Sequence, residues 1–258
     1  MKEPAVTDHP ASLEGKTVIM TGAGSGIGRA GALALARAGA HVLGVGRRGD
    51  ALRDTAAQHP GIAVLTADIT ADGAPRKVVE AAVERWGRLD VLVNNAGATA
   101  MMPLAETDAR RIVDLLALNV TAPSLLAHAA LPHLTASRGT IVNISSVFGH
   151  RPLPGAAHYA ASKAALEQLT RSWALELAAD GIRVNALAPG PTESQALHAS
   201  GLPHAVVEEI KRDEADRIPL GRRGTPEEVA AWILHLADPA AAWITGQVIT
   251  VDGGLELV

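Results

Sequence analysis

The residues with the clearest chemical potential are Tyr159 and Lys163, within the stretch HYAASKAAL. Tyr159 is the only tyrosine among 258 residues, and it stands four residues before a lysine. At that spacing in a helix, the two side chains project from one face. A single remaining tyrosine also arises by chance, so the pattern by itself is weak and the rest of the chain must decide.

A phenol beside an ammonium group is suited to acid–base catalysis. The ordinary pKa of a phenol is about 10, so a base that works near pH 7 needs a pKa about three lower, which corresponds to roughly 4 kcal/mol. An ammonium about 4 Å away contributes on the order of 4 kcal/mol at an effective dielectric constant of 20. Desolvation of the phenol opposes part of that gain. The pair is therefore adequate for proton transfer without a metal ion.

The elements that would position this pair alternate along the chain. Short apolar runs predict strands, and the amphipathic or alanine-rich segments between them predict helices. Apolar strands without alternation, separated by helices, indicate a parallel sheet that is covered on both faces. The sequence thus predicts an α/β fold with a doubly wound parallel sheet in a single domain, residues 13–258, after a tail over residues 1–12. We expect about seven strands, at 16–20, 41–46, 62–68, 89–97, 139–146, 183–190 and 246–254, and helices at 29–40, 48–59, 75–87, within 106–134, at 158–180 and at 225–238.

The last predicted helix begins with a recognisable signal. Thr225 is a suitable N-cap, Pro226 suits the first helical position, and Glu228 is placed to complete a capping box.

A glycine-rich turn, VIMTGAGSGIGRA, joins the first strand to the first helix. Gly22, Gly26 and Gly28 would let the backbone approach a pyrophosphate, and the helix start offers free N–H groups and the positive end of a dipole. A simple packing turn is the alternative, but the strand–turn–helix context favours dinucleotide binding.

The spacing TGxxxGxG resembles that of the short-chain dehydrogenase/reductase (SDR) family, in the branch whose chains are about as long as this one. The family's other motifs follow in order: NNAG at 94–97, Asn119, the serines at 145–146, YAASK at 159–163, PG at 189–190 and VDGG at 251–254. The resemblance extends from about Leu13 to Gly254. It implies a Rossmann-like fold with a substrate lid at about 194–218.

The resemblance implies a catalytic set of Asn119, Ser146, Tyr159 and Lys163. Ser146 lies 13 residues before Tyr159, as the family's serine does, and would hold the substrate oxygen. Asn119 would anchor a water molecule that links Lys163 to solvent. Tyr159 would pass a proton to or from the substrate oxygen while a hydride moves between the nicotinamide and the substrate carbon.

The end of the second strand bears on which dinucleotide is used. Enzymes that use NAD usually carry an acid about 20 residues after the loop, but here Gly46 is followed by Arg47 and Arg48, and the first carboxylate is Asp50. Guanidinium groups pair well with a 2′-phosphate, which favours NADP. NAD stays open because both arginines can equally face solvent, and because Ser25 occupies a loop position that is basic in many NADP-preferring members.

The remaining cofactor contacts follow from the resemblance alone. Asp68 and Ile69 would hold the adenine, although Asp68 also suits a turn at the end of a strand. Asn94, Ala96 and Gly97 would line the ribose, and the segment 189–194 would meet the carboxamide. The predicted cofactor-binding residues are Gly22, Ser25, Gly26, Ile27, Gly28, Arg47, Arg48, Asp68, Ile69, Asn94, Ala96, Gly97, Tyr159, Lys163, Pro189, Gly190, Thr192 and Ser194.

Several classes of function are disfavoured by composition. A net charge of −4 without a long basic run argues against nucleic acid, and the absence of cysteine excludes disulfides and thiolate chemistry. We find no secretory signal and no apolar run of roughly 18 residues, so we expect a cytoplasmic protein without a membrane span.

The histidines do not predict a metal site. His128 and His133 are off one helical face and no HExxH pattern exists. His150 and His158 flank the catalytic segment, where they suit loop and helix-start positions better than contact with a substrate.

We therefore expect an NADP-preferring dehydrogenase or reductase that acts on a small-molecule alcohol–carbonyl pair, of the 3-oxoacyl or the sugar and polyol type. A non-catalytic dinucleotide-binding sensor is the alternative. An epimerase or dehydratase is disfavoured by the loop spacing and the short C-terminus. The resemblance further implies a homotetramer, paired through the helices at 106–134 and 158–180 and through the last strand.

Overall fold

A parallel sheet forms the centre of the protein. The structure, a computed structural model, describes residues 12–193 and 203–258. Within these ranges the sheet has seven strands in the order β3-β2-β1-β4-β5-β6-β7, and all of its pairings are parallel. The predicted doubly wound α/β fold is thus confirmed. The strands are β1 (Thr17–Thr21), β2 (His41–Gly46), β3 (Ile62–Thr66), β4 (Val91–Asn94), β5 (Thr140–Ile144), β6 (Arg183–Pro189) and β7 (Val248–Val251).

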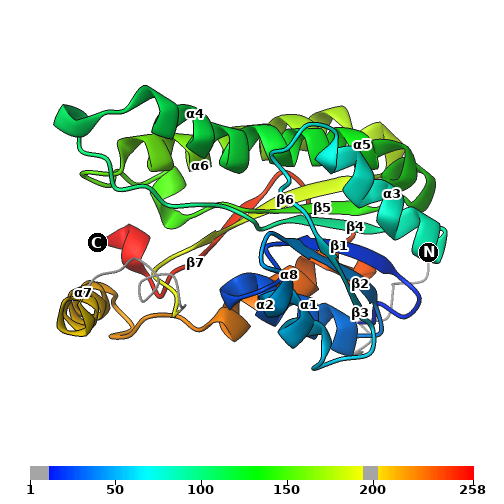
Figure 1. Ribbon diagram of the computed structural model, residues 1–258, viewed down its shortest axis with the longest axis horizontal. Helices are drawn as coiled ribbons and strands as arrows, with labels where there is room; N and C mark the ends of the chain where they lie inside the picture. Colours follow the sequence, from blue (N-terminus) through cyan, green and yellow to red (C-terminus); the bar gives the residue numbers. More distant parts are fainter. Residues whose placement is uncertain (1–11, 194–202) are drawn as a thin grey trace, which may run out of the picture.

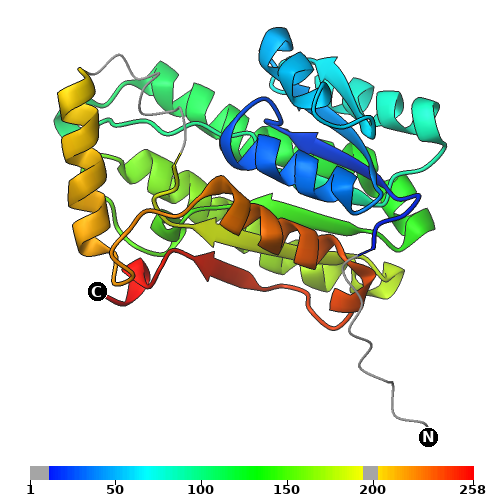
Figure 2. The same ribbon diagram turned by 90° about the horizontal axis from the view of Figure 1, so that it is seen from below.

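Helices cover both faces of the sheet (Figure 1). One face carries α1 (Gly26–Arg37), α2 (Gly49–Ala56) and α8 (Pro226–Ala237), and Figure 2 shows α1 and α8 side by side in front of the strands. The other face carries α3 (Ala74–Trp86), α5 (Ala122–Ser137) and α6 (Ala157–Glu176). Each layer has its own apolar core, because apolar strands present buried side chains to both faces.

The start of α8 agrees with its sequence signal. The Thr225 hydroxyl accepts a hydrogen bond from the Glu228 N–H, and the Glu228 carboxylate accepts one from the Thr225 N–H. The predicted capping box is therefore confirmed.

The helical segment before β5 is less regular than the sequence suggests. It runs from a 3-10 turn (Leu104–Glu106) through α4 (Ala109–Leu116) and a π turn (Ala117–Thr121) into α5. The combined run 109–137 is long and apolar enough to cross a membrane by length and composition, contrary to the expectation of no such stretch. Its second half instead packs Leu126, Ala130 and Leu134 into the core, as a buried helix of a sheet protein does.

The predicted lid, 194–218, is described from residue 203 onward. Helix α7 (His204–Arg217) lies there, near the C-terminal end of the chain (Figures 1 and 2). Residues 194–202 of the lid, and all but the last residue of the predicted tail, lie outside the described residues.

Candidate active site

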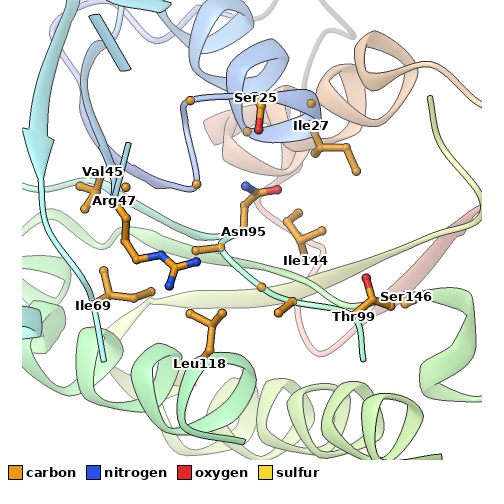
Figure 3. A pocket seen from close by; sticks show the side chains of 18 of the residues that line it. Ser25, Ile27, Val45, Arg47, Ile69, Asn95, Thr99, Leu118, Ile144 and Ser146 are labelled. Atoms are coloured by element: carbon orange, nitrogen blue, oxygen red, sulfur yellow. The ribbon is translucent and has the colours of Figure 1, made fainter. Parts of the chain in front are cut away.

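A cavity of about 460 Å³ lies at the carboxyl ends of the strands (Figure 3). Successive strands are added on one side of β1 as far as β3, and then on its other side from β4 onward. Ligands of open α/β sheets bind at such a switch point, here between the neighbouring strands β1 and β4. Most of the predicted site residues line this cavity. They are Gly22, Ser25, Gly26, Ile27, Gly28, Arg47, Arg48, Asp68, Ile69, Ala96, Gly97, Ser146, Tyr159, Lys163, Pro189, Gly190 and Thr192.

The glycine loop is shaped for close backbone approach. Gly22 has a φ of +72°, which L side chains rarely adopt. A Cβ on Gly28 would come within 2.0 Å of the Gly22 carbonyl oxygen, so only glycine allows α1 to start this close to the loop. The first turn of α1 carries no acidic side chain, and the Ser25 side chain caps none of its N–H groups. This helix start therefore fits a pyrophosphate, which its N–H groups and dipole would bind.

Two arginines follow β2 at the edge of the cavity. Both are exposed, and the Arg47 guanidinium points into the cavity (Figure 3). The Arg48 guanidinium donates a hydrogen bond of 2.8 Å to the Ser25 hydroxyl, which joins the end of β2 to the glycine loop. Asp50 lies in α2, outside the residues that line the cavity.

Asp68 combines the two roles that the sequence left open. It lines the cavity, and its Oδ1 also accepts hydrogen bonds from the backbone and hydroxyl of Thr70 in the turn after β3. These bonds hold the pKa of the Asp68 carboxyl below its ordinary value, and the charge of Arg47 adds to the effect.

One predicted cofactor residue faces away from the site. Asn94 is buried at the end of β4, where its Nδ2 donates to the Asn143 side chain 2.9 Å away. Its neighbour Asn95 lines the cavity instead, and its Nδ2 donates to the Thr21 carbonyl 2.8 Å away. The NNAG motif offers two adjacent asparagines, and only the end point of β4 decides which one faces the cavity. Ser194 lies outside the described residues.

Lys163 is buried, with 5% of its surface exposed. Its Nζ donates a hydrogen bond of 2.8 Å to the Ile144 carbonyl, at the end of β5. Burial lowers the pKa of Lys163 to about 8, although the charge of Glu167 acts in the opposite direction.

The pKa of Tyr159 shifts in the opposite direction from the one expected from the sequence. Burial raises the pKa of its phenol above the ordinary value, and a hydrogen bond with Ser146 opposes only part of that rise. The charge of Lys163 does not outweigh burial, because its Nζ is hydrogen-bonded to the Ile144 carbonyl and lies 6.0 Å from the centre of the phenol ring. The phenol is therefore held in its protonated form, ready to donate a proton.

Asn119 sits in the π turn, a feature that the sequence analysis did not foresee. Its Oδ1 accepts from the Ala98 N–H over 3.0 Å, and its Nδ2 donates to the Ala98 carbonyl and the Ser162 hydroxyl. A Cβ built on Gly97 would lie 3.2 Å from Asn119 Oδ1 and 3.3 Å from Lys163 Nζ, so Gly97 separates these two groups. π turns often mark functional positions.

The loop after β6 is held by an arginine that sequence reasoning missed. Arg223 is nearly buried, and its Nη2 donates to the carbonyl of Thr192, which lines the cavity. Its Nε lies 3.5 Å from Glu193 and 3.3 Å from Glu214 of α7. Arg223 thus joins the loop, the lid helix and the site, and no local pattern would have revealed it.

Neither candidate histidine lines the cavity. His150 is hydrogen-bonded to Glu167 and Glu256, and His158 lies in the first turn of α6. Over residues 12–193 and 203–258, no group of three or more histidine, aspartate or glutamate side chains is arranged to hold a metal ion.

The chain is similar to several known proteins over most of its length. A family model described as enoyl-(acyl carrier protein) reductase matches residues 22–256. The chain is 40% identical to the 3-oxoacyl-(acyl-carrier-protein) reductase of Thermotoga maritima, with 95% of this chain and 99% of that protein covered. It is 35% identical to the sorbitol dehydrogenase of Cereibacter sphaeroides, with 94% and 98% covered.

A solved structure has the same fold. It is a short-chain dehydrogenase/reductase of unknown function from Caenorhabditis elegans, with cofactor. It superimposes with a TM-score of 0.89 at 37% identity and covers 95% of this chain and 97% of its own.

Proposed function

Since the chain belongs to the short-chain dehydrogenase/reductase family, we propose that it is an NADP(H)-preferring oxidoreductase that interconverts an alcohol and its carbonyl compound. Its curated relatives include reductases and dehydrogenases, and the family is one of NAD(P)-dependent oxidoreductases.

The observation that carries the proposal is the meeting of Ser146, Tyr159 and Lys163 in the cavity that begins at the glycine loop. When bound, a nicotinamide supplies or accepts the hydride. The protonated Tyr159 donates its proton to the oxygen of a carbonyl substrate, and the Ser146 hydroxyl, hydrogen-bonded to the phenol, orients that oxygen. The ammonium of Lys163 then stabilises the phenolate that remains.

The preference for NADP rests on the positive charge after β2. A 2′-phosphate at this edge would meet Arg47, which points into the cavity, and Arg48, which Ser25 already orients. Guanidinium groups bind phosphate through paired, charge-assisted hydrogen bonds. No carboxylate from this stretch lines the cavity to hold a ribose 2′-hydroxyl, since its first acidic residue, Asp50, is not among the lining residues.

We also propose that the protein forms a homotetramer and is located in the cytoplasm. Val113 and Leu125 are apolar and more than 45% exposed on the run from α4 to α5, and Trp243 and Leu257 are more than 80% exposed toward the C-terminus. Such surfaces are typical of interfaces between subunits. Light scattering should give a mass near four times 26.6 kDa, and a monomer mass would contradict it.

Binding of NADPH and of NADH, each followed by quenching of tryptophan fluorescence, tests the cofactor. We expect NADPH to bind more tightly, and Arg47→Ala and Arg48→Ala each to weaken NADPH by about tenfold to a hundredfold, the value of a charged hydrogen bond, while NADH changes little. Arg76→Ala, an exposed arginine of α3, is the control. Equal affinity for both cofactors in the wild type would refute the preference.

Turnover tests the rest of the proposal. Reduction of 3-oxoacyl thioesters with NADPH is compared with oxidation of sugars and polyols with NADP⁺. Turnover in one set assigns the substrate class, whereas tight cofactor binding without turnover on any alcohol or carbonyl compound would favour the non-catalytic sensor.

A further inference from the structure

Helix α6 buries a second charged group, Glu167, one turn after Lys163. Among the described residues, the buried charged side chains are Asp90, Lys163, Glu167 and Arg223, so two of these four stand on one helix four residues apart. Only 2% of the Glu167 surface is exposed. A buried carboxylate is costly unless it is paired and hydrogen-bonded, so its presence beside the catalytic lysine needs an explanation.

The contacts of Glu167 lead directly to the catalytic residues. Its Oε1 accepts a hydrogen bond of 2.9 Å from the Ser145 hydroxyl, and that hydroxyl also lies 3.3 Å from the Lys163 carbonyl oxygen. Ser145 is the chain neighbour of Ser146 and lines the cavity. The carboxylate therefore holds the end of β5, which presents the catalytic serine, against the helix that presents the tyrosine and the lysine.

The turn after Ser146 is built around the same carboxylate. A Cβ on Gly149 would come within 2.2 Å of Glu167 Oε1, so a side chain there would displace the carboxylate. His150 follows, with its Nδ1 3.1 Å from Glu167 Oε1 and its Nε2 2.7 Å from Glu256 Oε2. The imidazole thus bridges two carboxylates that are 89 residues apart in the chain.

Other charged groups near this network are few and identifiable. Arg171 of α6 lies 3.7 Å from Glu167 Oε2, on its outer side. Glu256 accepts from the Thr250 hydroxyl, and its N–H donates to Asp252. Arg151 donates to the Leu255 carbonyl and not to either carboxylate. Lys163 is the one buried cation on the same helix face among the described residues.

We propose that the buried charge of Glu167 stabilises the ammonium of the catalytic Lys163 across one turn of α6, and that Glu167 also positions Ser146 through Ser145, with His150 holding the carboxylate in place. The catalytic role of Lys163 in this proposal rests on the proposed function. The electrostatic interaction between Glu167 and Lys163 does not, because it depends only on the folded chain. Two opposite charges one turn apart on a buried helix face stabilise each other far more than they would in water.

The pKa values agree with this assignment. Burial lowers the pKa of Lys163, and Glu167 is the charge that opposes it and keeps the value at about 8. Burial also lowers the pKa of His150, but its hydrogen bonds with Glu167 and Glu256 outweigh that and raise it overall. Without Glu167, Lys163 would lose its proton closer to neutral pH.

Nuclear magnetic resonance of protein with ¹³C-labelled lysine side chains tests the pairing directly. The chain has five lysines, and Lys163→Arg identifies the signal of Lys163. We expect Glu167→Gln to lower the pKa of Lys163 by on the order of one pH unit. Glu176→Gln, an exposed carboxylate on the same helix, should leave it unchanged. The same pKa in Glu167→Gln and the wild type would overturn the proposal.

Two further measurements guard against ambiguity. Glu167→Asp keeps the charge on a shorter side chain, so its Lys163 pKa should lie between those of Glu167→Gln and the wild type; if only this variant folds, an unchanged pKa refutes the pairing. The alkaline limit of kcat for carbonyl reduction should move to lower pH in Glu167→Gln by the same amount as the lysine signal. If the wild type turns over no substrate but Glu167→Gln still lowers the pKa of Lys163, the proposed function is refuted and the interaction between Glu167 and Lys163 stands.

Discussion

The Nζ of Lys163 lies 6.0 Å from the centre of the Tyr159 ring and is hydrogen-bonded to the last residue of β5, Ile144. This bond joins the strand that leads to Ser146 with the helix that carries Tyr159. The lysine therefore has two separate tasks, since it holds these elements in register and also places a positive charge near the phenol.

Replacement of Tyr159 by Phe removes the hydroxyl that we propose transfers the proton. We expect kcat to fall by about 10²- to 10⁴-fold, the usual contribution of a general acid. NADPH binding should weaken by no more than about tenfold, because a single hydrogen bond contributes about 1 kcal/mol. Steady-state kinetics and fluorescence titration measure the two quantities, and normal turnover in the variant would refute the role of Tyr159.

The single tyrosine allows a direct measurement of its ionisation. Absorbance of the phenolate near 295 nm reports Tyr159 alone, since the chain has no other tyrosine. In the protein without cofactor, we expect a pKa above the ordinary value of 10.0, because burial disfavours the phenolate. Ser146→Ala should raise the pKa further, because it removes the hydrogen bond that stabilises the charged form. A lower pKa in Ser146→Ala would contradict this geometry.

Lys163 should make the stability of the protein depend on pH in the alkaline range. Its pKa falls from 10.5 in the unfolded chain to about 8 in the folded protein, so the unfolded state binds more protons between these values. The wild type should therefore gain up to about 3 kcal/mol of unfolding free energy relative to Lys163→Met as the pH rises from 8 to 10.5. Urea unfolding of both proteins across this range measures the difference, and parallel curves would refute the depressed pKa.

Arg223 offers a test of how the lid helix is attached. Arg223→Met leaves Glu214 partly buried without its cation, so we expect a loss of about 3 kcal/mol in stability near pH 7. Burial already raises the pKa of Glu214, and loss of the arginine raises it further. The deficit should therefore shrink as the pH falls and Glu214 takes up a proton.

The neighbouring arginine supplies the control for that experiment. Arg222 forms an exposed pair with Glu228, and exposed pairs contribute little, so Arg222→Met should change the unfolding curve only slightly. Thermal unfolding at pH 7 and pH 5 compares the variants. A deficit for Arg223→Met that grows toward pH 5 would exclude Glu214 as the group responsible.

Local sequence patterns were sufficient to predict the strands, most of the helices and most of the residues that line the cavity. The strand before Gly22 and the capping box at Thr225 each depend on a few consecutive residues, and both formed as expected. The cavity followed because parallel strands bring their carboxyl ends together, so motifs far apart in sequence converge without any knowledge of their side-chain contacts.

Contacts between distant residues were beyond the reach of those patterns. His150 looked like a loop residue, and only the fold shows that it bridges Glu167 and Glu256. The choice between Asn94 and Asn95 depended on where β4 ends, which propensities locate only to within a few residues. Whether the pKa of Tyr159 is raised or lowered depended on whether the Lys163 ammonium faces the phenol or the Ile144 carbonyl.

The π turn at Ala117–Thr121 shifts the phase of the helical run around Asn119. A π turn holds one residue more than the α-helix around it, so the segments on its two sides are offset by about 100°, the angle of one residue. Deletion of one residue here would restore a regular α-helix, but it would rotate Asn119 away from Ala98 or turn the buried stripe of α5 out of the core. The π turn thus lets Asn119 face Ala98 while the buried stripe of α5 faces the core, an arrangement that one continuous α-helix through these residues would not give.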